Sequence, residues 1–360
     1  MALLSDVFDP KELETMVSAG YIRIQEHPVA PYRILNYTER AQFDRVWNDA
    51  TIACRGLVVD SNDRVIARPF GKFFNYGEHD GHLPDGPVVV TEKMDGSLGI
   101  LYEMPDGTMA VSTRGSFCSE QAQHATAVWN DKYSTTFQPQ KRWTYLFEII
   151  YPANRIVVNY SALDDLVLLG AVDIETGISI PLPTAAEGWP GPVVDVLDYT
   201  TLADALSAPP REGVEGCVVH FTAGDVRMKI KEAEYVRLHK LVTGMSERRV
   251  WEIVSNGDSL DSLLTDVPDE FYDFVTTTRN ALLEQFAALT ADVFRRYEQL
   301  IATLGPDFIR RDYALAVKAA GDFALAPCLF AALDGKDFSG TVWKHLRPAE
   351  HVLWSSTGND

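Results

Sequence analysis

Apolar and polar positions follow two different rhythms along the chain, and the change between them falls near Val242. From Tyr21 to about Asp225, short apolar runs are separated by turn signals such as Pro105-Asp106-Gly107. This pattern is typical of β-strands joined by turns. The runs that we expect to form strands are residues 57–59, 87–91, 98–102, 145–150 and 166–169.

Two helices are expected in the same half of the chain. Asp9-Pro10-Lys11-Glu12 predicts a helix start, because Asp caps the first free N–H groups and Pro suits the first helical position. Gly20 should end that helix. A second helix is expected from Ser119 to about Trp129.

Beyond Lys231 the pattern becomes helical. Apolar residues recur in steps of three and four from Phe271 to Ile301, which predicts one long amphipathic helix that begins at Pro268 and ends near Gly305. Further helices are expected over residues 312–320, 323–333 and 342–346. Strands followed by helices predict an α+β fold. We expect antiparallel sheets with flanking helices in residues 1–242 and an all-α domain in residues 243–360.

Composition narrows the class of protein. The length of 360 residues fits two domains, and no run of 18 apolar residues predicts a membrane span. The first residues lack the basic flank of a secretory signal. The cysteines are far apart in the sequence and form no C-x-x-C pair, so we expect no zinc site and a cytoplasmic location.

The net charge of −19 restricts the kind of nucleic-acid partner. Proteins that hold duplexes without regard to sequence usually present a basic surface, because neutralised phosphates supply most of the affinity. An acidic chain can still bind a nucleic acid if its cations gather in one cleft. It would then favour a particular folded substrate over any duplex.

The candidate chemistry begins at Lys93, in the stretch Lys93-Met94-Asp95-Gly96-Ser97. An unprotonated lysine amine can attack phosphorus and form a phosphoramidate. Gly96 would let the backbone approach a ligand closely. Taken alone, these few letters fit an exposed turn lysine better than a nucleophile.

Other residues later in the chain change that interpretation. Glu148 and Glu215 each stand in or before an apolar strand, and Lys229 and Lys231 alternate on one face of another. Singly, such acids and lysines are typical of strand edges. Together and in this order they suit phosphoryl transfer: an amine nucleophile, carboxylates for Mg²⁺ (or Mn²⁺) and lysines for phosphates.

Several further stretches carry a family resemblance that spans nearly the whole chain, strongly to about residue 240. They are Tyr32-Arg33-Ile34, Cys54-Arg55-Gly56-Leu57-Val58, Arg68-Pro69-Phe70-Gly71-Lys72-Phe73-Phe74-Asn75, Arg114-Gly115-Ser116 and Pro152-Ala153-Asn154-Arg155-Ile156-Val157. With the residues above, they resemble the covalent nucleotidyltransferases. The resemblance is greatest to the RNA ligase 1 family of T-even bacteriophages, which are tRNA-repair ligases.

The resemblance implies a role for each matching residue. Lys93 would carry AMP, and Glu148 and Glu215 would hold the metal ion with Asp95 close by. The phosphates of ATP would be contacted by a set of basic residues: Arg55, Lys72, Arg114, Lys229 and Lys231. Tyr37 and Tyr235 match positions near the nucleotide, although half-buried structural aromatics are an equal alternative. A further acid of the family corresponds to Asp258 or Asp261, but an Asp after Asn256-Gly257 is also typical of a turn or cap.

The implied reaction is the ATP-dependent joining of RNA 5′-phosphate and 3′-hydroxyl ends through lysyl-AMP and adenylylated RNA. Residues 1–242 would form the adenylyltransferase domain. Residues 243–360 would confer RNA specificity, by resemblance for a tRNA broken in its anticodon loop. We expect a monomer.

Two alternatives share the same nucleotidyltransferase core. One transfers AMP to a different acceptor, and the other is a decayed module that only binds nucleotide or RNA. DNA ligases and capping enzymes carry a strand-rich OB-fold after this core, whereas helices are expected here. No G-x-x-x-x-G-K-[ST] phosphate-binding loop is present, which excludes a P-loop NTPase.

Overall fold

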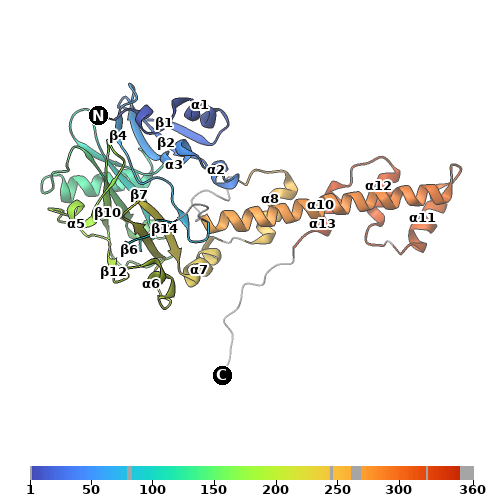
Figure 1. The fold of residues 1–360 in the computed structure, drawn as a ribbon. Helices are drawn as coiled ribbons and strands as arrows, with labels where there is room; N and C mark the ends of the chain where they lie inside the picture. The colour runs from blue at the N-terminus through green and yellow to red at the C-terminus, as the bar shows by residue number, and fades with distance from the viewer. Residues whose placement is uncertain (1, 79–82, 244–245, 261–268, 322, 349–360) are drawn as a thin grey trace. The chain divides into compact units, whose positions relative to one another are not determined.

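The computed structural model describes residues 2–78, 83–243, 246–260, 269–321 and 323–348. The chain divides into two compact units, Met1–Thr243 and Gly244–Asp360 (Figure 1). Each unit has its own core, and each is described by itself.

The first unit is built on three sheets. The first sheet has the order β1 (Ile22–Glu26), β2 (Tyr32–Tyr37), β3 (Arg55–Asp60) and β4 (Val65–Ala67). The second has the order β11 (Ser179–Ile180), β10 (Asp165–Asp173), β9 (Trp143–Ile150), β7 (Ser97–Glu103) and β8 (Met109–Ser112). The third has the order β12 (Val196–Leu197), β6 (Val88–Lys93), β13 (Gly216–Phe221), β14 (Val226–Lys231) and β5 (Phe74–Asn75). β5 pairs with β14 in parallel, and the other strand pairings are antiparallel.

Seven α-helices and three shorter helical turns flank these sheets in the described part of the first unit. The α-helices are α1 (Pro10–Ser18), α2 (Glu39–Phe43), α3 (Asp49–Ala53), α4 (Glu120–Val128), α5 (Leu182–Ala185), α6 (Leu202–Ser207) and α7 (Ala233–Thr243). The turns are η1 (Leu4–Asp6), η2 (Trp129–Tyr133) and η3 (Pro152–Asn154). The N-terminal caps of α1 and α4 are Asp9 and Ser119, as the sequence predicts.

Apolar faces of the first two sheets pack against each other and place the loop after β8 next to β3. Ile34 and Val58 of the first sheet share a buried cluster with Ile100 and Leu146 of the second. Gly56 permits this approach, because a Cβ there would lie 2.4 Å from Cδ1 of Ile100. Its φ of +96° is also a conformation that glycine adopts at little cost.

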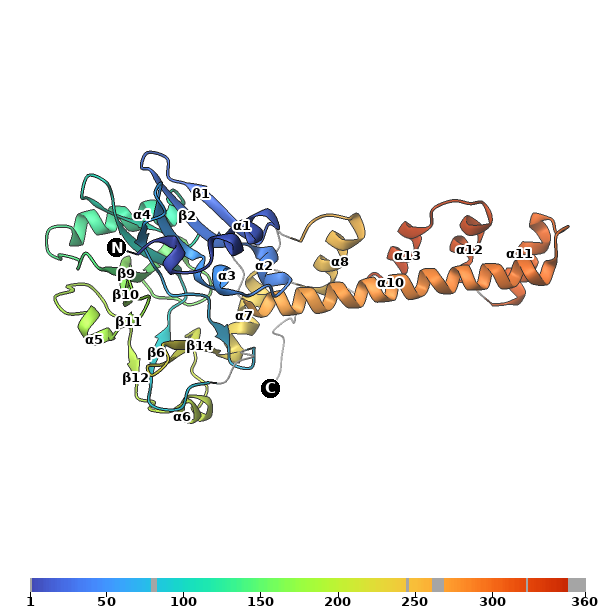
Figure 2. The same cartoon turned by 45° about the horizontal axis from the view of Figure 1, so that its top comes forward.

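The second unit is helical throughout its described residues. It consists of α8 (Glu247–Asn256), α10 (Asp269–Leu304), α11 (Arg310–Ala319), α12 (Ala326–Leu333) and α13 (Ser339–His345). Figure 2 shows the shorter helices lying along the 36-residue α10. Val293, Tyr313, Leu329 and Val342 are central to their shared core.

The structure confirms the α+β fold class and the strand-to-helix order predicted from periodicity. The short helices α2 and α3, and also α7 and α8, were not predicted. None of the described helices has the length and apolar character needed to cross a membrane.

Candidate active site

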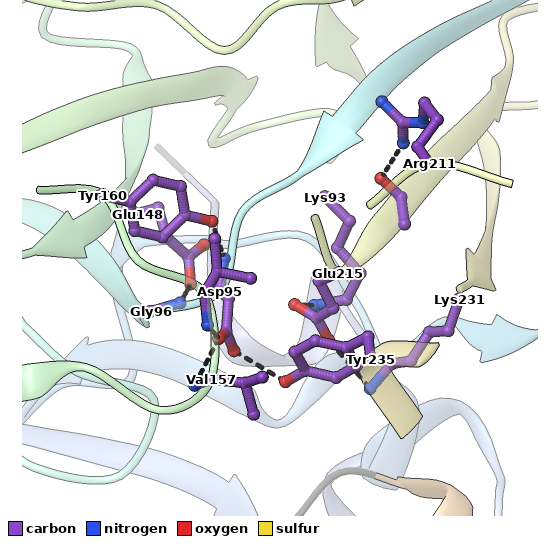
Figure 3. Close-up of polar contacts among 12 residues, drawn as sticks. Lys93, Asp95, Gly96, Glu148, Val157, Tyr160, Arg211, Glu215, Lys231 and Tyr235 are labelled. Atoms are coloured by element: carbon purple, nitrogen blue, oxygen red, sulfur yellow. Dashed lines mark hydrogen bonds and ion pairs between the residues drawn. The ribbon is translucent and has the colours of Figure 1, made fainter. Parts of the chain in front are cut away.

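Three strand ends of the third sheet bring Lys93 and Lys231 to a shared carboxylate. Gly216, the first residue of β13, is in register with Lys93 of β6 on one side and with Lys231 of β14 on the other. The preceding residue, Glu215, reaches both lysines (Figure 3). Lys93 Nζ donates to Glu215 Oε2 at 2.5 Å, and Lys231 Nζ lies 2.9 Å from Oε1.

Glu215 is a buried anion held between two cations, with 3% of its surface exposed. Burial alone would raise the pKa of its carboxyl group, but Lys93 and Lys231 outweigh that effect and hold the pKa below its ordinary value. Glu215 is therefore charged at neutral pH.

Backbone geometry at Gly216 allows this arrangement. Gly216 has a φ of +149°, and a Cβ there would lie 2.0 Å from the carbonyl oxygen of Ile230. Arg211 donates to the carbonyl oxygen of Gly216 at 2.7 Å and also lies 3.6 Å from a carboxylate oxygen of Glu232 (Figure 3). Arg211 thus ties the start of β13 to the end of β14. No local sequence pattern pointed to this residue.

Glu148 approaches the loop after Lys93 from the second sheet. Its Oε1 accepts a hydrogen bond from the N–H of Gly96 at 3.0 Å. A Cβ on Gly96 would lie 2.6 Å from the carbonyl oxygen of Ile149, so glycine is required at this close approach. Burial raises the pKa of Glu148 to about 7, an effect that Lys93 opposes and Glu215 reinforces.

Asp95 organises the loop that follows Lys93. Its Oδ2 accepts hydrogen bonds from the N–H groups of Val157 and Val158, at 2.9 and 2.8 Å, and its Oδ1 accepts one from the Tyr235 hydroxyl at 2.7 Å. The N–H of Asp95 donates to the Tyr160 hydroxyl at 2.7 Å. Asp95 was predicted beside the metal. That prediction stays untested, and these contacts assign it a positioning role.

A second group of predicted residues lies against aromatic rings. Lys72 is buried, and its Nζ lies 5.1 Å from the ring of Trp47 and 5.2 Å from that of Phe74. Arg114 donates to the Tyr37 hydroxyl at 2.9 Å. Such cation–π contacts hold a cation in place without neutralising it.

Two more of the predicted cations lie against the ring of Phe73. The guanidinium of Arg55 lies 5.2 Å from its centre, and Lys229 Nζ lies 5.7 Å from it. Lys229 of β14 is also in register with Asn75 of β5, the strand that directly follows Phe73. Arg55 and Lys229 therefore share one aromatic support.

Contacts arrange most of the predicted residues in three groups. The first contains Lys93, Asp95, Gly96, Glu148, Glu215, Lys231 and Tyr235; the second contains Tyr37, Lys72 and Arg114; the third contains Arg55 and Lys229, which share the ring of Phe73. The structure brings no cluster of three or more potential metal ligands together among the residues it describes.

Two further acids, Asp258 and Asp261, were predicted in the helical part of the chain. Asp258 follows α8, where its N–H donates to Ile253 after the left-handed Gly257, as expected for a helix end. Asp261 lies outside the described residues.

Comparison with known proteins identifies the family. The family model for RNA ligases of the T4 RNA ligase 1 type matches residues 53–235, slightly more than half of the chain. The chain belongs to the RNA ligase family. The matched span contains eleven of the twelve predicted site residues, since Tyr37 alone precedes it.

Individual relatives agree with the family. An RNA ligase of Rhodothermus phage RM378 is 23% identical over 387 aligned positions, which cover 84% of this RNA ligase and 85% of the relative. An archaeal ATP-dependent RNA ligase structure is 15% identical, with a TM-score of 0.43 over 78% of this chain and 79% of its own. A Naegleria gruberi RNA ligase variant solved with ATP and Mn is 20% identical, with a TM-score of 0.35 over 43% and 52% of the two chains. The match to the family model confirms the expectation of an RNA ligase from the sequence.

Proposed function

We propose that this RNA ligase uses Lys93 to take AMP from ATP and then seals RNA 5′-phosphate and 3′-hydroxyl ends. The observation that carries the proposal is the shared carboxylate of Glu215, which holds Lys93 Nζ at 2.5 Å and Lys231 Nζ at 2.9 Å. A lysine in an exposed turn would not be expected to place its amine against a buried carboxylate. A positioned amine beside a second cation suits attack on a phosphate.

The proposed reaction has three balanced transfers. Lys93 Nζ loses a proton and bonds to the α-phosphorus of ATP, while the bond to the β-phosphate oxygen breaks and pyrophosphate leaves. An oxygen of the RNA 5′-phosphate then attacks the AMP phosphorus, and the Lys93 amine leaves. The RNA 3′-hydroxyl finally attacks the 5′-phosphorus, loses its proton and expels AMP.

Glu215 and Lys231 serve the first transfer in complementary ways. Glu215 directs the Lys93 amine by accepting a hydrogen bond from one of its N–H groups, and the nitrogen must lose a proton before its lone pair can attack phosphorus. Lys231, whose side chain is almost fully buried, remains as the cation next to the reacting centre. Its fixed charge can stabilise the negative charge that develops on the phosphate oxygens.

Glu148 and Glu215 are the residues that would hold a divalent metal ion, Mg²⁺ or Mn²⁺. Carboxylate oxygens suit these ions, and Mg²⁺ in particular keeps several of its waters when a protein supplies one or two carboxylates. That preference fits a site with two acids. When bound, the ion neutralises charge on the α-phosphate.

The aromatic-supported cations would bind the rest of the ATP triphosphate. Arg55 lies in β3, Lys72 lies between β4 and β5, Arg114 lies in the loop after β8, and Lys229 lies in β14. Arginine matches phosphate oxygens through paired N–H donors, whereas lysine acts as a point charge. Tyr37 fixes Arg114 through its hydroxyl group.

For the RNA, we propose a substrate with a break in a folded strand, with tRNA cut in its anticodon loop as the first candidate. The acidic net charge of −19 disfavours indiscriminate binding to duplexes. The helical unit would supply the preference for shape.

Free cysteines throughout the described chain fit a reducing cytoplasm.

Incubation with α-labelled ATP and Mg²⁺, and separately with Mn²⁺, tests the central claim. Wild-type protein should become labelled with AMP, and Lys93→Ala should not. Lys93→Ala should still seal a strand supplied already adenylylated, since only the last transfer is then needed. A wild-type protein that acquires no label would overturn the mechanism, and labelling without sealing would point to a different acceptor.

The RNA preference needs its own comparison. Sealing of a nicked anticodon stem-loop should exceed sealing of a linear single strand of the same sequence at equal concentration. Equal rates on the two substrates would overturn the tRNA proposal but leave the lysyl-AMP mechanism intact.

A further inference from the structure

The basic side chains of β14 alternate along one face of the strand. Arg227, Lys229 and Lys231 stand two residues apart, and side chains at this spacing point to the same side of a sheet. Lys231 contacts Glu215, and Lys229 lies against the ring of Phe73. Both lysines were predicted from the sequence, whereas Arg227, the third cation of this row, was not.

Arg227 is buried, and its charge is balanced inside the protein. Its side chain is 12% exposed, and its Nη1 donates to Oδ1 of Asp225 at 3.0 Å. Asp225 also accepts from Nε2 of His220 at 2.7 Å and from the N–H of Ser179 at 2.8 Å. Burial would raise the pKa of Asp225, but His220, Arg227 and Ser179 outweigh that effect and hold the pKa well below its ordinary value. Because Asp225 occupies and neutralises Arg227, this guanidinium is poorly suited to bind a phosphate itself.

The Arg227 guanidinium instead lies on the ring of Phe70. Its Cζ is 4.0 Å from the ring centre, well inside the distance of about 6 Å at which a cation and an aromatic ring attract each other. The tip of the same ring reaches β10, where a Cβ on Gly170 would lie 3.3 Å from Cζ of Phe70. Phe70 therefore contacts β14 of the third sheet and β10 of the second.

The segment that carries this ring, residues 68–73, runs from β4 to β5 and belongs to no strand. Backbone hydrogen bonds hold its two ends. The N–H of Arg68 donates to Oγ1 of Thr144 at 2.8 Å, and the N–H of Lys72 donates to the carbonyl oxygen of Ile52 at 2.8 Å. The aromatic contact with β14 lies between these ends and fixes the middle of the segment.

The same segment places two of the predicted phosphate contacts. Arg55 Nη1 donates to the carbonyl oxygen of Phe70 at 3.4 Å, and Lys72 follows two residues after Phe70. Burial lowers the pKa of Arg227, Asp225 opposes this effect, and the nearby charge of Arg55 adds to it. Asp225 thus lets two guanidinium groups lie near each other. A shift of Phe70 would move both Arg55 and Lys72.

We propose that Arg227 is a positioning residue for the ATP triphosphate: it fixes Phe70, and Phe70 fixes the segment that holds Arg55 and Lys72. The inference rests on the proposed function and deepens it, because it concerns how the proposed phosphate contacts are kept in place. Arg227 acts on ATP only through Phe70.

Two substitutions remove the contact from either side. Arg227→Lys keeps a positive charge beside Asp225 but lacks the planar guanidinium that stacks on a ring. Phe70→Leu keeps an apolar side chain but lacks the ring. Each should raise the KM for ATP in lysyl-AMP formation about tenfold and leave kcat within about threefold. Arg142→Lys is the matched control, because Arg142 pairs with Asp173 at 2.9 Å but is exposed, and it should leave both constants unchanged.

The double variant tests whether Arg227 acts through Phe70. If it does, Arg227→Lys should change the KM for ATP by no more than about twofold in the Phe70→Leu background, because the contact is already lost. Independent effects would instead multiply to about 100-fold and would overturn the proposed route.

A second comparison separates positioning from a general loss of structure. Sealing of a strand supplied already adenylylated uses no triphosphate, so its rate should stay within about twofold of wild type in both single variants. An equal loss in adenylylation and sealing would overturn the inference. A KM for ATP within about twofold of wild type in both single variants would do the same.

Binding measured without catalysis distinguishes failure of this inference from failure of the proposed function. Calorimetry with α,β-methylene-ATP, whose bridge between the α- and β-phosphorus does not break, reports affinity even in a protein that forms no lysyl-AMP. Binding about tenfold weaker in Arg227→Lys and Phe70→Leu, with Arg142→Lys unchanged, supports the positioning role in either case. Equal binding by wild type and both variants counts against it.

Discussion

Lys93 Nζ lies 2.5 Å from Oε2 of Glu215, a carboxylate with 3% of its surface exposed. Glu215 therefore directs the amine in the absence of ligands. The same carboxylate also binds Lys231. One acid thus sets the position of both the proposed nucleophile and the cation beside it, and its loss should affect folding and chemistry together.

Replacement of Glu215 by Gln should destabilise the protein and stop adenylylation. The amide cannot balance two lysines, one of them almost fully buried, so the free energy of unfolding should fall by about 3 kcal/mol. Lysyl-AMP formation should fall at least about 100-fold, because Glu215 both orients the Lys93 amine and holds the charged Lys231 beside it. Urea unfolding and label incorporation measure the two effects. Glu234→Gln, which removes an exposed ion pair on α7, should change neither.

Glu148 should make stability fall as pH rises from about 5 to 8. Burial raises its pKa to about 7, so the folded protein retains a proton that the unfolded chain, at the ordinary value of 4.5, releases earlier. The folded state is then favoured below that window and loses this advantage, on the order of 2 kcal/mol, above it. Denaturant unfolding of wild type and Glu148→Gln without metal checks the prediction. Parallel stability curves for the two proteins would count against it.

The titration of Glu148 should also change the rate of lysyl-AMP formation with pH. A carboxylate is needed to hold a cation, so lysyl-AMP formation should increase as pH rises through about 7. Added Mg²⁺ competes with the proton for Glu148 and should move the midpoint to lower pH. The measurement is the single-turnover rate against pH at two metal concentrations. If the midpoint pH of the rate does not change with the metal concentration, Glu148 is not a ligand of the metal ion.

Tyr235→Phe should slow adenylylation through Asp95. Loss of the 2.7 Å hydrogen bond leaves Asp95 with only its backbone donors, so the loop that carries Lys93 is held less firmly. We expect kcat to fall about tenfold, with the KM for ATP nearly unchanged and a loss of about 1 kcal/mol in stability. Tyr199→Phe is the control, because Tyr199 is a partly buried tyrosine packed against the apolar cluster of the third sheet. An increase in KM alone would instead make Tyr235 a nucleotide contact.

Gly216→Ala should prevent normal folding, because its Cβ would overlap the carbonyl oxygen of Ile230 at 2.0 Å. A loss of about 4 kcal/mol or more is expected from the combined clash and unfavourable φ. Gly213→Ala is a matched control in the same loop: its φ is +72°, but nothing lies within 4 Å of the added atom. It should cost about 1 kcal/mol. Similar melting temperatures for the two variants would contradict the steric explanation.

Periodicity predicted the elements that are stabilised by long, regular apolar faces. The helix expected from Pro268 to Gly305 is α10, and the predicted strands lie within β3, β6, β7, β9 and β10. The helices α2 and α3 have five residues each, too few to form without tertiary support, and polar caps at Thr38 and Asn48 help to hold them. Their sequences carry no periodic signal of that length.

The residues of the candidate site also fall into those that the sequence predicted and those that only the structure reveals. Lys93, Glu215 and Lys231 could be predicted because their order along the chain suits one reaction, and the sheet register then brings them together. Arg211 and Tyr160 contact backbone groups of distant segments, so only tertiary structure reveals them.

The aromatic surroundings of Lys72 give this ligase an intrinsic optical signal. The Trp47 indole lies 5.1 Å from Lys72 Nζ and 5.4 Å from the ring of Phe74. Indole emission responds to nearby charge, so neutralisation of Lys72 by a phosphate should change its intensity. Stopped-flow fluorescence of the unlabelled enzyme, with a Trp47→Phe reference, would then follow nucleotide arrival in real time, before any bond to Lys93 forms.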